Sequence, residues 1–243
     1  DYYPEKPHQA WTQGEDTDNH HWVPIYDYPN ERSTFETILT VNKKYKAVSN
    51  GELLSKTEND DETYTWHWKE NFPMVPYLIS FVVGDYVKIE DKYNNIPVNY
   101  WVYESNQKEA NRSFGLTTDM MSFFGKETGV EYPYEKYDQI IVADFMFGGM
   151  ENITLTHNTD RTMYDEFASP DVSSEGLVAH ELAHQWFGNM ITTRNWANAW
   201  LNEGFATYYS RKYYENKYGY NEGEYIRYSE MNSYFSSNKR WKR

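Results

Sequence analysis

One short pattern constrains this chain more than any other feature of its sequence. His180 and His184 lie four positions apart with Glu181 between them, so the stretch has the form HExxH. Residues four apart on an α-helix share a face, with Cβ atoms about 5 to 6 Å apart. Both imidazoles can then bind one small cation. The pattern therefore predicts a helix that faces a metal site.

A third ligand follows further along the chain. Glu203 is separated from His184 by 18 residues. Catalytic zinc usually has three protein ligands and an open fourth position, and two histidines with one carboxylate are a known set. Glu181 lies too close to His180 along the backbone to be a comfortable third ligand, but it is well placed to act as general base on a water molecule. We therefore predict one zinc ion, bound by His180, His184 and Glu203, with Glu181 as the catalytic residue of a peptidase.

Two packed helices are predicted to build this site. Ser173 offers capping chemistry at the start of the first helix, and Gly188 follows as its C-terminal stop. The second helix is predicted over residues 199–217, with Glu203 near its start and basic residues in its C-terminal half. Thr207, one turn after Glu203, is a candidate partner that orients a ligating histidine.

Composition limits the class of protein and its partners. A length of 243 residues favours two domains or parts of domains, and a hydrophobic content of 39% with 19% aromatic residues describes a folded chain. The formal charge of -14 disfavours nucleic acid or an anionic membrane as partner and weakly favours substrates with a positive group. We find no signal peptide or apolar run long enough to span a bilayer, which predicts a soluble segment. The absence of cysteine excludes thiolate zinc ligands and leaves the compartment open.

Strand patterns dominate residues 1–90, which we predict to form an antiparallel β domain. Apolar residues recur at even spacing, and Asn50 with Gly51 is a hairpin signal. The apolar run 77–83 is typical of a strand buried on both faces. The polar cluster at 91–95 is the predicted domain boundary.

Residues 91–243 mix helical and strand patterns. A strand is predicted near residues 97–103, a helix over about 107–126 and a strand around 139–143, before the two metal helices. This order predicts an α+β catalytic domain. The fold class expected for the whole chain is therefore α+β.

Four further motifs have sequences that are found together in one known family. They are Thr12-Gln13-Gly14-Glu15, Gly148-Gly149-Met150-Glu151-Asn152, Trp186-Phe187-Gly188-Asn189 and Trp200-Leu201-Asn202-Glu203-Gly204-Phe205. With them the chain resembles, over nearly its whole length, the aminopeptidase N type gluzincins, the family that includes leukotriene hydrolase. This resemblance implies a thermolysin-like catalytic domain over residues 91–243. Gly149 stands where many members carry Ala and Gly14 where many carry Cys, and neither difference removes a catalytic group.

The resemblance also implies which residues bind the substrate. In the family, the strand of the second motif lines the cleft and pairs with the peptide backbone, which here implicates Gly148, Gly149 and Met150. Its glutamate, Glu151 in this chain, binds the free α-amine of the peptide.

Residues near the N-terminus are implied to complete the substrate site. Glu15 is the expected second carboxylate for the amine, and Gln13 and Met150 are expected beside the first side-chain pocket. An ammonium held by carboxylates is a charge-assisted contact that fixes the distance from the chain end to the zinc. The implied function is zinc-dependent removal of N-terminal residues from peptides that have a free amine.

Two other functions share part of this pattern. A thermolysin-type endopeptidase would have HExxH and Glu203 but needs an open cleft without an amine anchor, and Glu151 argues against it. A non-catalytic zinc-binding or peptide-binding module would keep the fold without turnover. The intact set of His180, Glu181 and His184 weighs against that alternative.

The resemblance further implies a larger enzyme, of which this chain lacks both ends. Family members begin with a longer β domain and continue after the zinc helices into a large helical domain. They also use a tyrosine well beyond the glutamate ligand to stabilise the oxyanion, whereas 40 residues follow Glu203 here. Loss of one oxyanion donor costs about 100- to 1000-fold in rate. We therefore expect residues 1–243 alone to bind zinc but to hydrolyse peptides poorly.

Overall fold

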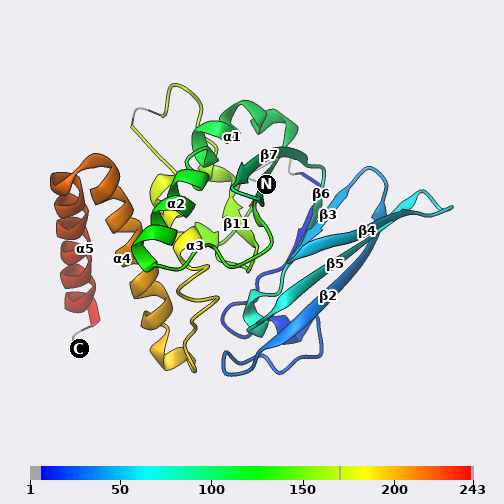
Figure 1. Ribbon diagram of the computed structural model, residues 1–243, viewed down its shortest axis with the longest axis horizontal. Helices are drawn as coiled ribbons and strands as arrows, with labels where there is room; N and C mark the ends of the chain where they lie inside the picture. Colours follow the sequence, from blue (N-terminus) through cyan, green and yellow to red (C-terminus); the bar gives the residue numbers. More distant parts are fainter. Residues whose placement is uncertain (1–6, 170, 242–243) are drawn as a thin grey trace.

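The chain has an α+β architecture with strands at one end and helices at the other (Figure 1). The computed structural model describes residues 7–169 and 171–241. In Figure 1, β2, β5 and β4 form the end of the molecule opposite α4 and α5. The predicted α+β class is confirmed. Within the described ranges, none of the helices combines the length and the apolar character that a bilayer crossing requires.

The N-terminal part consists of two three-stranded antiparallel sheets. On β5, the buried Trp66 and Trp68 alternate with the more exposed Thr65 and His67, as a half-buried strand requires. The first sheet has the order β1 (Gln9–Trp11), β6 (Phe81–Gly84) and β3 (Lys46–Ser49). The second has the order β2 (Ser33–Asn42), β5 (Thr63–Met74) and β4 (Glu52–Glu58).

A mixed five-stranded sheet carries the second half of the chain. Its central strand β9 is parallel to both of its neighbours and is fully buried, whereas β7 and β10 pair antiparallel at the two edges. The order is β10 (Gly149–Met150), β11 (Leu155–Thr159), β9 (Tyr137–Val142), β8 (Ile96–Val102) and β7 (Val87–Tyr93). The boundary predicted between residues 90 and 91 falls within β7, and the division into domains stays a prediction.

Five α-helices and five short 3-10 helices complete the described residues. The α-helices are α1 (Gln107–Phe114), α2 (Thr117–Thr128), α3 (Glu175–Ala183), α4 (Trp200–Tyr218) and α5 (Tyr220–Trp241). The 3-10 helices are η1 (Asn19–His21), η2 (Pro76–Leu78), η3 (Glu104–Asn106), η4 (Asp160–Thr162) and η5 (Trp196–Asn198). α3 packs against α4, α2 and β10, which places the HExxH helix between the second metal helix and the edge of the sheet.

Three predictions of local structure were wrong or incomplete. The single helix expected over 107–126 is divided into α1 and α2, and the Thr117 hydroxyl donates to the Phe114 carbonyl at the break (2.6 Å). Asn50 and Gly51 do not close a hairpin, because β3 pairs with β6 and β4 pairs with β5. Instead the Asn50 side chain donates to the carbonyls of Leu78 and Ile153. These tertiary contacts cannot be predicted from a local turn motif.

The apolar run 77–83 is not one strand. Its first residues form η2, where Pro76 occupies the first position, and its last residues belong to β6. The Asn19 side chain donates to the carbonyls of Pro76 (2.7 Å) and Ile79 (3.1 Å) on the two sides of this turn. The resulting turn, not a strand, sets the direction of the Tyr77 side chain.

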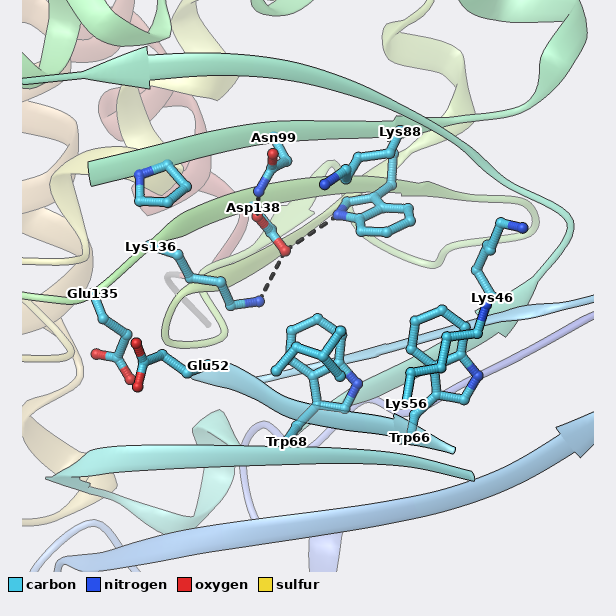
Figure 2. A pocket seen from close by; sticks show the side chains of 13 residues that line it. Lys46, Glu52, Lys56, Trp66, Trp68, Lys88, Asn99, Glu135, Lys136 and Asp138 are labelled. Atoms are coloured by element: carbon cyan, nitrogen blue, oxygen red, sulfur yellow. Dashed lines mark hydrogen bonds and ion pairs between the residues drawn. The ribbon is translucent and has the colours of Figure 1, made fainter. Parts of the chain in front are cut away.

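A buried ion pair joins the N-terminal sheets to the five-stranded sheet. The Lys136 ammonium lies 2.8 Å from Asp138 Oδ2, donates to the Ser49 carbonyl (2.9 Å) and stands 4.5 Å from the centre of the Trp68 ring. Asp138 also accepts from the Trp101 indole (3.2 Å). Figure 2 shows Lys136, Asp138 and Trp68 in the wall of a cavity, which has a volume of about 440 Å³ and is lined by residues of both halves. Lys136 thus pairs with the buried carboxylate of Asp138 and connects the five-stranded sheet to β3.

Replacing Lys136 by methionine should destabilise the protein. The Lys136→Met change leaves Asp138 buried without its cation, so we expect the free energy of unfolding to fall by about 3 kcal/mol. Urea unfolding followed by tryptophan fluorescence measures this. Lys88→Met is the matched control, because Lys88 is exposed and solvent screens its pair with Glu90, so only a small loss of stability is expected. Equal, small losses from both changes would contradict the prediction.

Candidate active site

The end of α3 presents both histidines on one face, as the spacing predicts. His180 lies in the last turn of α3 and His184 directly follows the helix, where its N–H still donates to the His180 carbonyl (3.2 Å). Because this hydrogen bond continues the helical turn, the two rings face each other. Their Nε2 atoms lie 3.0 Å apart.

Glu203 reaches the same point from the first turn of α4. Its Oε2 lies 3.2 Å from His180 Nε2, and its Oε1 lies 3.6 Å from His184 Nε2. All three predicted ligands are brought together, with one ligand atom of each within 4.8 Å of the others. Although burial by itself would raise the pKa of Glu203, hydrogen bonds from His180 and His184 hold it below its usual range. The group is able to hold a metal ion.

The other ring nitrogen of each histidine has a partner of its own. His184 Nδ1 lies 2.9 Å from the Phe187 carbonyl, which can only accept, so Nδ1 carries the hydrogen and Nε2 is directed at Glu203. His180 Nδ1 lies 3.5 Å from the Thr207 hydroxyl. Thr207 therefore lies beside a ligating histidine, as the sequence analysis predicted. Such contacts fix the ring orientation that a metal ligand needs.

Glu181 lies beside the ligands in a space that Gly149 leaves open. A Cβ at Gly149 would stand 2.4 Å from Glu181 Oε1, so a side chain at this position would require the Glu181 side chain to shift. Burial raises the pKa of Glu181 well above its usual range, and the nearby carboxylates of Glu151 and Glu203 add to the shift. A carboxylate in this state accepts a proton readily.

Glu151 is held from both its backbone and its side chain. Its carbonyl accepts from the side-chain amides of Gln185 (3.1 Å) and Asn189 (2.8 Å). Its Oε1 accepts from the Tyr77 hydroxyl (2.9 Å), and burial first of all raises the pKa of Tyr77, so that the hydroxyl remains a donor. The carboxylate is 3% exposed. Glu151 is thus one of the most restrained groups of the site.

Glu15 joins this carboxylate from the N-terminal part of the chain. One oxygen each of Glu15, Glu151 and Glu203 lie within 4.8 Å of one another. Burial, and then the charges of Glu151 and Glu203, raise the pKa of Glu15 to about 8. The structure therefore brings Glu15 to the site predicted for it.

Gln13 and Met150 lie together but do not line the cavity. The Gln13 amide lies 3.0 Å from Met150 Sδ, and Met150 is 2% exposed. Sequence reasoning missed Phe147 as a wall residue, although it directly precedes the motif that begins at Gly148. The cavity of about 410 Å³ is lined by Glu15, Phe147, Gly148, Gly149, Glu151, Leu177, His180, Glu181, His184 and Glu203.

The cavity is strongly negative. Four of the described residues that line it are glutamates and none is Lys or Arg. Burial alone would lower the pKa of His184, but the surrounding carboxylates, first of all Glu151, raise it to about 10. The site therefore attracts positive charge, as a metal ion or as a cationic group of a ligand.

Two family models match the sequence. The Peptidase family M1 domain matches residues 112–241, and the Peptidase M1 N-terminal domain matches residues 2–78. Both ligand helices, β10 and Glu151 lie within the first match. Glu15 and Tyr77 lie within the second.

Curated relatives show the same likeness. The chain is 32% identical to bovine (Bos taurus) glutamyl aminopeptidase over 82% of its length, and 35% identical to aminopeptidase N of Oryctolagus cuniculus over 82%. It is 33% identical to mitochondrial aminopeptidase 2 of Saccharomyces cerevisiae over 85%. The matched part is 21% of the first relative and 22% of the other two, so the chain spans about a fifth of their length. Since the M1 domain model alone matches more than half of the 243 residues, the chain belongs to peptidase family M1, which confirms the resemblance to the aminopeptidase N type gluzincins.

Proposed function

We propose that the chain contains the active site of a zinc-dependent aminopeptidase, which removes N-terminal residues from peptides with a free amine. One observation carries this proposal. A His–His–Glu set able to hold a metal and a second pair of carboxylates, Glu15 and Glu151, share one cavity. An endopeptidase needs the first group but not the second.

The donor set suits zinc. Two imidazole nitrogens and one carboxylate are a common set for catalytic zinc, and the contact from His184 Nδ1 to the Phe187 carbonyl orients Nε2 toward the other two donors. His180, His184 and Glu203 would hold the ion. When bound, zinc supplies a Lewis acid that polarises the scissile carbonyl and makes a water molecule more acidic.

Glu181 is the proposed general base. One of its carboxylate oxygens lies within 4.8 Å of a ring nitrogen of His184, a proposed metal ligand, and of an oxygen of Glu151, a proposed amine anchor. The Glu181 carboxylate accepts the proton of the attacking water and passes it to the departing amine of the peptide.

Glu151 and Glu15 are the proposed anchor for the α-amine. Burial first, and then repulsion from Glu151 and Glu203, raise the pKa of Glu15 to about 8. A substrate ammonium between Glu15 and Glu151 would offset the repulsion. Because Glu151 is fixed relative to His184, at 4.0 Å between Oε1 and Nδ1, the anchor sets where the chain end lies relative to the metal ligands. Cleavage after one residue follows from that fixed distance.

The names of the relatives support an exopeptidase. Glutamyl aminopeptidase, aminopeptidase 2 and aminopeptidase N are all named as aminopeptidases. Together with the Glu15 and Glu151 pair, they favour this function over the thermolysin-type endopeptidase and the non-catalytic module.

We expect the purified protein to bind one zinc ion per chain. Glu203→Ala removes one of three ligands and should lower the zinc content to a small fraction of one per chain after dialysis. Inductively coupled plasma mass spectrometry measures this content. Glu166→Ala is the control, because Glu166 is exposed and does not line the cavity. Full zinc content in the Glu203→Ala protein would show that another residue is the third ligand.

We expect Glu181→Gln to keep zinc and lose turnover. The amide has nearly the same shape but cannot accept the proton of water, so kcat should fall at least 100-fold. Hydrolysis of amino-acid arylamides, measured beside zinc content, separates the two effects. Glu166→Gln serves as the control. A near-native rate in Glu181→Gln would assign the base to another group.

Glu151→Gln should weaken the use of free amines while leaving the metal in place. The change removes a charge that the substrate ammonium contacts, so kcat/KM for an arylamide should fall about 100-fold at unchanged zinc content. Unmutated protein should reject the N-acetylated form of the same arylamide. Equal cleavage of free and acetylated substrates by the unmutated protein would favour the endopeptidase.

A further inference from the structure

Tyr77 connects the N-terminal part of the chain to the proposed amine anchor. The side chain is 1% exposed, and its hydroxyl donates to Glu151 Oε1 at 2.9 Å. We propose that Tyr77 is a positioning residue, which fixes the Glu151 carboxylate for contact with the substrate α-amine. This inference rests on the proposed role of Glu151.

The Glu151 carboxylate needs such a partner. Its neighbours Glu15 and Glu203 bring like charges within 4.8 Å, and repulsion between them favours rotation of the Glu151 side chain away from the cavity. Among residues 7–169 and 171–241, the Tyr77 hydroxyl is the hydrogen-bond donor to this carboxylate. His184 Nδ1, at 4.0 Å from Glu151 Oε1, adds attraction but no hydrogen bond to this carboxylate, so the Tyr77 hydroxyl is the donor that sets its direction.

The direction of the Tyr77 hydrogen bond is itself determined. Asn202 Oδ1 accepts from the Thr193 N–H (3.0 Å), which fixes the orientation of the Asn202 amide. Asn202 Nδ2 then donates to the Tyr77 oxygen (3.2 Å), so the hydroxyl hydrogen is left for Glu151. The Trp196 ring packs edge-on against Tyr77, with ring centres 5.0 Å apart. Asn202 directly precedes Glu203, so these hydrogen bonds connect Glu151, through Tyr77, to the residue beside a proposed metal ligand.

The same turn also places the second carboxylate. A Cβ at Gly14 would stand 2.4 Å from the Tyr77 carbonyl, so the segment that carries Glu15 lies directly against the Tyr77 backbone. Asn19, just beyond that segment, is hydrogen bonded to the carbonyl of Pro76. Tyr77 and its turn therefore position both carboxylates of the anchor.

Binding of two matched ligands tests this role without turnover. Leucine hydroxamic acid has the α-amine, and 4-methylpentanohydroxamic acid is the same molecule without it. The ratio of their dissociation constants, from isothermal titration calorimetry on the zinc-loaded protein, isolates the amine contact. We expect Tyr77→Phe to reduce this preference about tenfold, and to change the affinity for the amine-free ligand less than twofold.

Two further variants separate positioning from general stability. Tyr86→Phe is the matched control, because Tyr86 is also buried and its hydroxyl bonds to Gln9 and the Ile141 carbonyl, away from the cavity. It should leave the preference unchanged. In a Glu151→Gln background, Tyr77→Phe should have almost no additional effect, because it acts through that carboxylate. Zinc content and Tm are measured for every variant.

The outcomes distinguish this inference from the function on which it rests. If unmutated protein has no preference for the amine ligand, or Glu151→Gln does not reduce it, the proposed anchor fails and the role of Tyr77 fails with it. If Glu151→Gln reduces the preference but Tyr77→Phe does not, the anchor stands and the inference is overturned. Equal weakening of both ligands by Tyr77→Phe would also overturn it. Should Tyr77→Phe fail to fold, Asn202→Ala provides the same test by freeing the Tyr77 hydroxyl.

Discussion

Repulsion between carboxylates is the constraint on which the rest of the site depends. Glu15, Glu151, Glu181 and Glu203 line one cavity, and burial is the main reason that the pKa of Glu15 rises to about 8. Away from bulk water such charges act on one another strongly. The two histidines offset part of the charge, and a metal ion and a substrate ammonium would offset more. The arrangement selects positive charge at two neighbouring places, which suits an exopeptidase better than an endopeptidase.

The segment after α3 joins the proposed metal helix and substrate strand into one unit. Gln185 and Asn189 both donate to the Glu151 carbonyl, so the distance from the HExxH turn to the anchor does not depend on loop conformation. The Arg32 guanidinium donates to the carbonyls of Asn189 (3.0 Å) and Met190 (3.2 Å), which ties the N-terminal sheets to the same segment. Fixed distances of this kind are what positioning in catalysis requires.

The predictable residues of the site are those marked by a short sequence pattern or by a motif of the family. His180 and His184 were predictable because helical spacing alone places them on one face, and Glu203 lay at the distance from them that the family pattern implies. Tyr77 was not, because a tyrosine in an apolar run looks like core and its hydroxyl acquires a role only through tertiary contacts. The same limit applies to Asn50, which was predicted to form a hairpin turn. Its side chain instead donates hydrogen bonds to carbonyl groups that are distant in the sequence.

The proposed anchor is divided between two parts of the chain, and this has an energetic consequence. Glu15 and Tyr77 come from connections in the N-terminal part of the chain, whereas Glu151 and the three ligands come from the second half. Any change in how the halves pack shifts the carboxylates relative to the histidines, even when every ligand stays in place. The proposed zinc ligands come from α3, from the residue that follows it and from α4, whereas the proposed amine anchor combines Glu151 with Glu15 from the N-terminal part. The buried Lys136 pair, which crosses between the halves, is one of the contacts that hold this packing.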